Sequence, residues 1–179
     1  TLPTITTSVN EMLSEGILEV IPFAESELVN AMGRKPTAIA FKADTACAIG
    51  VELGPYATRA ALLNMRGKVL ALSEHSVEED YEQMLLQIKR QVEELMQYAA
   101  GRFLGVGVGL PGFIDCENGL VRSSSRKGWA GKRLAEDLQG LLNVPVIIDN
   151  NVRIRAMGYE LSLQEYKAGT FAYFFVSKG

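Results

Sequence analysis

The stretch from Cys47 to Leu72 most constrains the fold of this chain, because it holds two tight turns between apolar runs. Gly54-Pro55 marks the first turn, and Met65-Arg66-Gly67-Lys68 marks the second. Three strands joined in this way form an antiparallel meander, which we expect at residues 47–53, 58–65 and 68–75. A chain of 179 residues with 47% hydrophobic residues is long enough to bury a core against such a sheet.

After the meander, helical and strand patterns alternate. Apolar residues recur at helical spacing in 80–102, 132–142 and 152–161. Residues 103–112 predict a strand whose alternating glycines let backbone or ligand approach one face closely. We further expect a loop at 113–129, a buried strand at 144–149, and the first strand of another sheet at 171–176. This order predicts an α/β fold.

The first 44 residues have a different pattern. Residues 3–15 predict an amphipathic helix whose core-facing stripe is Ile5, Val9, Met12 and Leu13, and strands are expected at 16–21 and 37–42. Helix, strand, loop and strand match the second half of a winged helix-turn-helix. The DNA-binding residues would then be Thr4, Thr6, Thr7 and Asn10 on the helix, with Arg34 and Lys35 in the wing. Three Lys/Arg against six Asp/Glu in 1–44 argue against this module, since DNA-binding modules are usually basic.

Composition and cysteine usage indicate the cellular compartment of the protein. The chain has no apolar run of about 18 residues and no signal-peptide pattern at its start. Cys47 and Cys116 lie far apart without a CxxC partner, which favours reduced thiols in a cytoplasmic protein that does not enter a membrane. A polar, helix-opening start and an end directly after an apolar segment indicate part of a longer protein.

Four motifs follow in order along the chain: Ile49–Gly54, Gly105–Gly112, Gly128-Trp129 and Val146–Asn151. In this order and spacing the chain resembles the ROK family of repressors and sugar kinases, which have an actin-like ATPase (ribonuclease H-like) fold. The helix and wing at the start resemble the repressor branch of that family. The resemblance implies a partial winged helix-turn-helix at 1–44, the first lobe of the actin-like domain at 45–162, and the start of an incomplete second lobe at 163–179.

The chain departs from the family's kinases at two places. Their first turn carries an acidic residue followed by Leu/Ile-Gly-Gly-Thr, whereas this chain has Glu52-Leu53-Gly54-Pro55-Tyr56. Pro55 has no N–H to donate to a phosphate, and Tyr56 adds a bulky ring. The kinases' general base is the Asp of an Asn-Asp pair; here the pair is Asn150-Asn151, and a carboxamide cannot take up that proton. We expect no catalytic residue and no enzyme activity.

The same resemblance implies a sugar site. Gly112, Asn150 and Asn151 match positions that line it in the family, and Ser125 stands where an Asn contacts the sugar before Gly-Trp. Arg126 and Lys127 follow; a basic pair beside the pocket would favour a phosphorylated or acidic sugar, but we expect a solvated loop. We expect no cofactor or metal in this segment, since the family's zinc ligands would lie beyond residue 179.

Three hypotheses follow. The first, which we favour, is a sugar-responsive transcriptional regulator, most simply a repressor, that binds operator DNA and a sugar or sugar phosphate effector. It would act as a homodimer or homotetramer in which domain closure changes the spacing of the DNA-binding heads. The second is an ATP-dependent sugar kinase of the ROK family. The third is a degenerate member of the family that acts through a protein partner.

Overall fold

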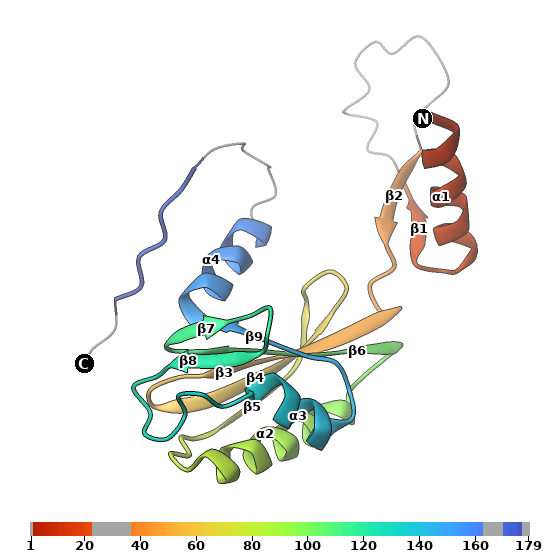
Figure 1. Ribbon diagram of the computed structural model, residues 1–179. Helices are drawn as coiled ribbons and strands as arrows, with labels where there is room; N and C mark the ends of the chain where they lie inside the picture. Colours follow the sequence, from red (N-terminus) through yellow and green to blue (C-terminus); the bar gives the residue numbers. More distant parts are fainter. Residues whose placement is uncertain (1, 23–36, 163–169, 177–179) are drawn as a thin grey trace.

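The computed structural model describes residues 2–22, 37–162 and 170–176 (Figure 1). At its centre lies a five-stranded sheet in the order β5-β4-β3-β6-β9. The predicted meander is confirmed as the antiparallel strands β3 (Ala46–Leu53), β4 (Ala57–Asn64) and β5 (Val69–Ser76). Strands β6 (Arg102–Leu110) and β9 (Val146–Asn150) continue the sheet parallel to β3. The carboxyl ends of β3, β6 and β9 therefore meet at one edge.

Helices α2 (Tyr81–Met96) and α3 (Leu134–Leu142) lie on one face of this sheet, and α4 (Asn151–Ser162) lies on the other (Figure 1). Helix α2 begins after Asp80, whose carboxylate accepts the Gln83 N–H at 3.0 Å. The main core forms beneath α2 and α3, where alternate residues of β3, from Cys47 to Leu53, meet the apolar stripes of both helices. No helix in the described ranges is both long and apolar enough to cross a membrane.

The face of the sheet that carries α4 is only partly covered, and we call it the open sheet face. Small residues such as Gly50 and Gly107 line a hollow of about 570 Å³ there. Around the hollow, Leu72, Ile147 and Leu161 have 72%, 73% and 85% of their surface exposed. Large apolar side chains are thus left in contact with water on this face.

The alternating glycines of β6 allow close approach, as the pattern predicted. A Cβ atom on Gly105, which has φ of +146°, would lie 2.4 Å from the Pro145 carbonyl oxygen at the start of the neighbouring strand segment. A Cβ atom on Gly109 would lie 3.3 Å from Cδ1 of Ile154 in α4. Glycine at these positions brings β9 and α4 against β6.

Residues 113–129 are not only a loop, contrary to our expectation. Strands β7 (Phe113–Asp115) and β8 (Leu120–Ser123) pair antiparallel across the turn at 116–119. The Asp115 carboxylate accepts the Asn118 N–H at 3.2 Å and fixes this turn. Hydrogen bonds from Asn118, followed by those from Arg122, lower the pKa of Asp115.

The strand expected at 171–176 is also wrong, because this described segment has no regular secondary structure. Its aromatic residues lie near α4 instead: the rings of Phe171 and Tyr159 have centroids 6.3 Å apart. An apolar run becomes a strand only when a neighbouring strand accepts its backbone hydrogen bonds. The apolar pattern of the sequence does not indicate whether such a neighbouring strand is present.

The chain begins with α1 (Leu2–Ser14), followed by β1 (Leu18–Ile21) and β2 (Ala38–Phe41), which pair antiparallel. The predicted core-facing stripe of α1 is partly wrong, because Ile5 is 63% exposed and Met12 is 40% exposed. The β1–β2 pair is too short to cover the whole stripe.

Contacts from Arg66 and Thr45 help attach this N-terminal segment to the sheet. Arg66, in the turn between β4 and β5, donates from Nε to the Phe41 carbonyl at 2.9 Å and from Nη2 to Glu19 Oε1 at 2.7 Å. The Thr45 hydroxyl donates to the Gly16 carbonyl at 3.0 Å. The segment is therefore held at the amino end of β3.

Candidate functional site

A cavity of about 520 Å³ lies at the edge where β3, β6 and β9 end, and we call it the strand-end pocket. Open α/β sheets place ligands at this edge, because loops and helix N-termini converge there. The structure brings together all four residues expected at a sugar site; these are Gly112, Ser125, Asn150 and Asn151. Phe175, from the segment after α4, adds an aromatic ring to the lining.

The first turn of the meander forms one wall of this pocket, and it offers few N–H donors to a ligand. The Gly54 N–H donates to the Ala57 carbonyl at 3.0 Å, and Pro55 has no N–H. The Glu52 carboxylate, just before the turn, forms an ion pair with Arg155 of α4. A phosphate cradle requires several free N–H donors, so this turn is poorly built for one.

The amide of Asn150 is used to hold the pocket wall together and not to contact a ligand. Its Nδ2 donates to the Gly112 carbonyl at 2.9 Å. Its Oδ1 accepts the N–H groups of Val152 at 2.9 Å and Arg153 at 3.1 Å, which caps the start of α4. These bonds link α4 to the loop after β6.

Asn151 is the amide best placed to meet a ligand. It is the first residue of α4, is only 8% exposed, and lines the strand-end pocket. Within the described ranges its side chain makes no hydrogen bond. Asp149, two residues earlier, pairs with Arg153 at 3.4 Å and borders only the open sheet face, whereas Asn151 borders both the open sheet face and the strand-end pocket. The amide of Asn151 can donate and accept hydrogen bonds but cannot act as a general base.

Arg126 is the pocket residue that sequence reasoning missed. We expected it in a solvated loop, yet it is only 9% exposed and lines the strand-end pocket, whereas Ser125 and Lys127 are exposed. Its guanidinium lies 4.8 Å from the centre of the Trp129 ring. An arginine three residues before the lone tryptophan was a usable signal, because arginine stacks readily on indole rings.

Trp129 anchors this corner of the core. It is fully buried, and its ring meets Tyr81 edge to face at a centroid distance of 5.4 Å. Its indole N–H donates to the Glu79 carbonyl at 3.3 Å. Trp129 therefore joins the β8–α3 loop to the start of α2.

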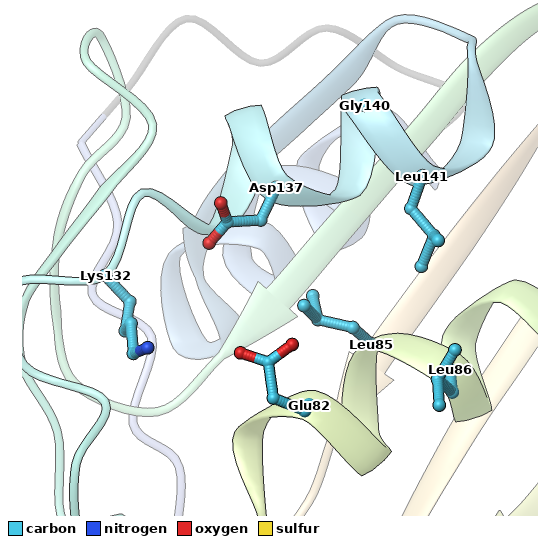
Figure 2. A pocket seen from close by; sticks show the side chains of 7 residues that line it. All are labelled: Glu82, Leu85, Leu86, Lys132, Asp137, Gly140 and Leu141. Carbon is cyan, nitrogen blue, oxygen red and sulfur yellow. The ribbon is translucent and has the colours of Figure 1, made fainter.

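A second pocket, of about 480 Å³, lies between α2 and α3, and Figure 2 shows Glu82 and Asp137 facing each other across it. Two of its polar groups, Lys132 and Asp137, contact Tyr81. Lys132 Nζ lies 4.5 Å over the Tyr81 ring, and Asp137 accepts the Tyr81 hydroxyl at 2.6 Å. Burial, together with this hydrogen bond, raises the pKa of Tyr81 well above its ordinary value. We therefore place the functional site at the strand ends.

The residues expected to bind DNA are only partly described. Thr6, Thr7 and Asn10 lie exposed on α1. The side chain of Thr4 and both wing residues, Arg34 and Lys35, fall outside the described residues.

Comparison with known proteins supports the kinase-like fold. The chain is 29% identical over 161 residues to a xylose repressor of Caldicellulosiruptor bescii, covering 87% of this chain and 39% of that protein. A solved ROK family transcriptional regulator, a homologue of the E. coli MLC protein, matches with a TM-score of 0.70 at 21% identity over 90% of this chain and 41% of its own. A ROK family glucokinase from Streptomyces griseus, in complex with glucose and AMPPNP, matches with a TM-score of 0.59 at 20% identity over 64% of this chain and 36% of its own.

This chain thus spans about two fifths of the length of the curated relatives it matches. The match to the ROK family model covers residues 48–179, which is most of the chain. It begins within the meander and includes the strand-end pocket. The chain belongs to the ROK family.

Proposed function

We propose that this chain is part of a cytoplasmic, sugar-responsive transcriptional repressor without kinase activity. The observation that carries the proposal is the wall of the strand-end pocket, where Gly54 and Pro55 offer few donors and Asn151 replaces a proton acceptor. A pocket of this kind suits recognition of a ligand without its chemical conversion. Several relatives are named xylose repressors, which is consistent with this function.

In this proposal residues 1–44 form the second half of a winged helix-turn-helix, 45–162 the first lobe of the sensing domain, and 163–179 the start of its second lobe. Helix α1 would enter the major groove with Thr6, Thr7 and Asn10 on its exposed side. Arg34 and Lys35 would contact phosphates from the wing. Two such modules in a homodimer or homotetramer would read two half-sites.

Operator binding is tested by a gel-shift assay with the full-length protein and its own promoter region. We expect salt-sensitive binding that an effector sugar weakens. Asn10→Ala should reduce the affinity about tenfold, the loss expected for one base-contacting amide. Gln97→Ala, an exposed change at the end of α2, is the matched control and should leave it unchanged. Absence of any salt-sensitive shift would refute the repressor.

The kinase alternative is tested separately, because the fold also matches a glucokinase that holds a nucleotide analogue. An ATP-dependent phosphorylation assay with a panel of hexoses and pentoses should show no turnover above background. Robust turnover would overturn the proposal. A protein that shifts DNA but shows no thermal shift with any sugar at millimolar concentration would instead respond to a protein partner.

A further inference from the structure

Arg126 places a buried positive charge at the wall of the strand-end pocket. The side chain comes from the loop between β8 and α3, and its guanidinium donates to two backbone carbonyls: Glu78 through Nη1 and Gly54 through Nη2, both at 3.0 Å. The stack on Trp129 holds the guanidinium in this orientation. The side chain of Arg126 is thus held in one conformation at the pocket wall.

This charge has no carboxylate directly against it. No acidic side chain among the described residues forms an ion pair with Arg126. Burial lowers its pKa, more than the Glu79 carboxylate at the same pocket raises it. A guanidinium nevertheless stays protonated, so the pocket keeps a desolvated cation. Buried charges are normally paired, because desolvation costs several kcal/mol per ion.

The remaining donors suit an anionic oxygen. A guanidinium carries five N–H groups, of which the two carbonyl bonds use two. Nearby, α4 begins at Asn151, and the positive end of its dipole borders the same pocket. Both features favour a negatively charged group, while the amide of Asn151 and the ring of Phe175 suit the hydroxyls and the apolar face of a sugar.

We propose that the strand-end pocket binds an anionic monosaccharide, a sugar phosphate or a sugar acid, and that Arg126 selects it over the neutral sugar. This inference rests on the proposed sugar sensing and adds the class of ligand. Charge-assisted hydrogen bonds to a guanidinium are stronger than neutral ones, so the anionic derivative should bind at least about tenfold more tightly than its parent sugar.

The experiment is calorimetric titration of the intact protein with neutral pentoses and hexoses, their phosphates and their uronic acids, with inorganic phosphate as a separate probe. Titrations with the two anionic series distinguish the phosphate from the carboxylate. Arg126→Gln should remove the preference for the anion. Arg126→Lys, which keeps the charge, should retain part of it. Lys127→Gln is the matched control, since this neighbouring cation is exposed and lies outside the pocket lining.

The outcomes separate the two proposals. Equal affinity for neutral and anionic sugars, or a preference that survives Arg126→Gln, refutes the selection by Arg126 but keeps the sugar sensor. Inorganic phosphate binding as tightly as a sugar phosphate refutes the sugar as ligand. No binding of any sugar refutes sugar sensing itself. If Arg126→Gln does not fold, the preference of the wild type and its partial retention in Arg126→Lys decide.

Discussion

Replacing Gly112 with alanine tests whether the backbone of the strand-end pocket requires a residue without a side chain at this position. Gly112 has φ of +132°, a conformation that L residues rarely adopt. A Cβ atom there would lie 2.3 Å from the carbonyl oxygen of Ser123, at the end of β8. That atom is backbone within the β7–β8 hairpin and cannot swing aside as a flexible side chain would.

Two costs add at this position. The backbone conformation costs an alanine roughly 1–3 kcal/mol. Moving the Ser123 carbonyl away adds roughly 1–3 kcal/mol of overpacking. Gly112→Ala should therefore lower the free energy of unfolding by about 2–6 kcal/mol. Gly140→Ala makes the same chemical change within α3, where nothing lies within 4 Å, and should raise it by about 0.4–1 kcal/mol.

Both variants are measured by urea denaturation followed by circular dichroism, with thermal unfolding as a second readout. The expected loss in Gly112→Ala corresponds to a melting temperature lower by roughly 4–24 °C for a chain of this size. If Gly112→Ala and Gly140→Ala change stability by the same amount, within about 0.5 kcal/mol, the close approach of Ser123 is not a real constraint.

Two further changes address neighbouring contacts. The pKa of Tyr81 is raised, so at high pH the folded chain keeps a proton that the unfolded chain, with an ordinary pKa of 10.0, has lost. Stability should fall as pH rises above about 10, and Tyr81→Phe should flatten this fall in thermal melts, whereas Tyr98→Phe, at an exposed site, should not. Asn150→Ala removes the cap of α4 and should cost about 1–2 kcal/mol in urea denaturation; Asn150→Asp, which keeps an acceptor, should cost less, and an equal cost would exclude capping as the cause.

The regular elements of this chain could be predicted because their patterns are local. The meander follows from two turns, and α2 follows from its apolar spacing and the Asp80 cap. The β7–β8 hairpin was missed although Asn118-Gly119 is a common hairpin turn, because its flanking strands are too short to show alternation. The segment at 171–176 was misjudged for the opposite reason, since its composition suits a strand that no described neighbour completes.

The residues of the candidate site could be located, but their roles could not. Arg126 is buried through bonds to residues 48 and 72 positions away in the chain, and its spacing from Trp129 indicates the stacking contact but not these bonds. Asn150 was expected to face a ligand, yet its amide is bonded to Gly112 and to the first turn of α4. Both adjacent amides line the pocket, but the start of α4 decides that Asn150 serves as its cap.

Strands β3 and β4 connect the strand-end pocket with the N-terminal segment. At one end β3 leads into the Gly54-Pro55 turn of the pocket, and at the other Thr45 and Arg66 hold the N-terminal segment. Eight residues of strand span about 26 Å, and a paired strand within a packed sheet is too stiff to bend over that length. If a ligand displaced the Gly54-Pro55 turn, β3 would therefore tilt as a rigid body, and its amino end would move the N-terminal segment. Such a tilt would move the β1–β2 pair, which Arg66 contacts through Glu19 and the Phe41 carbonyl.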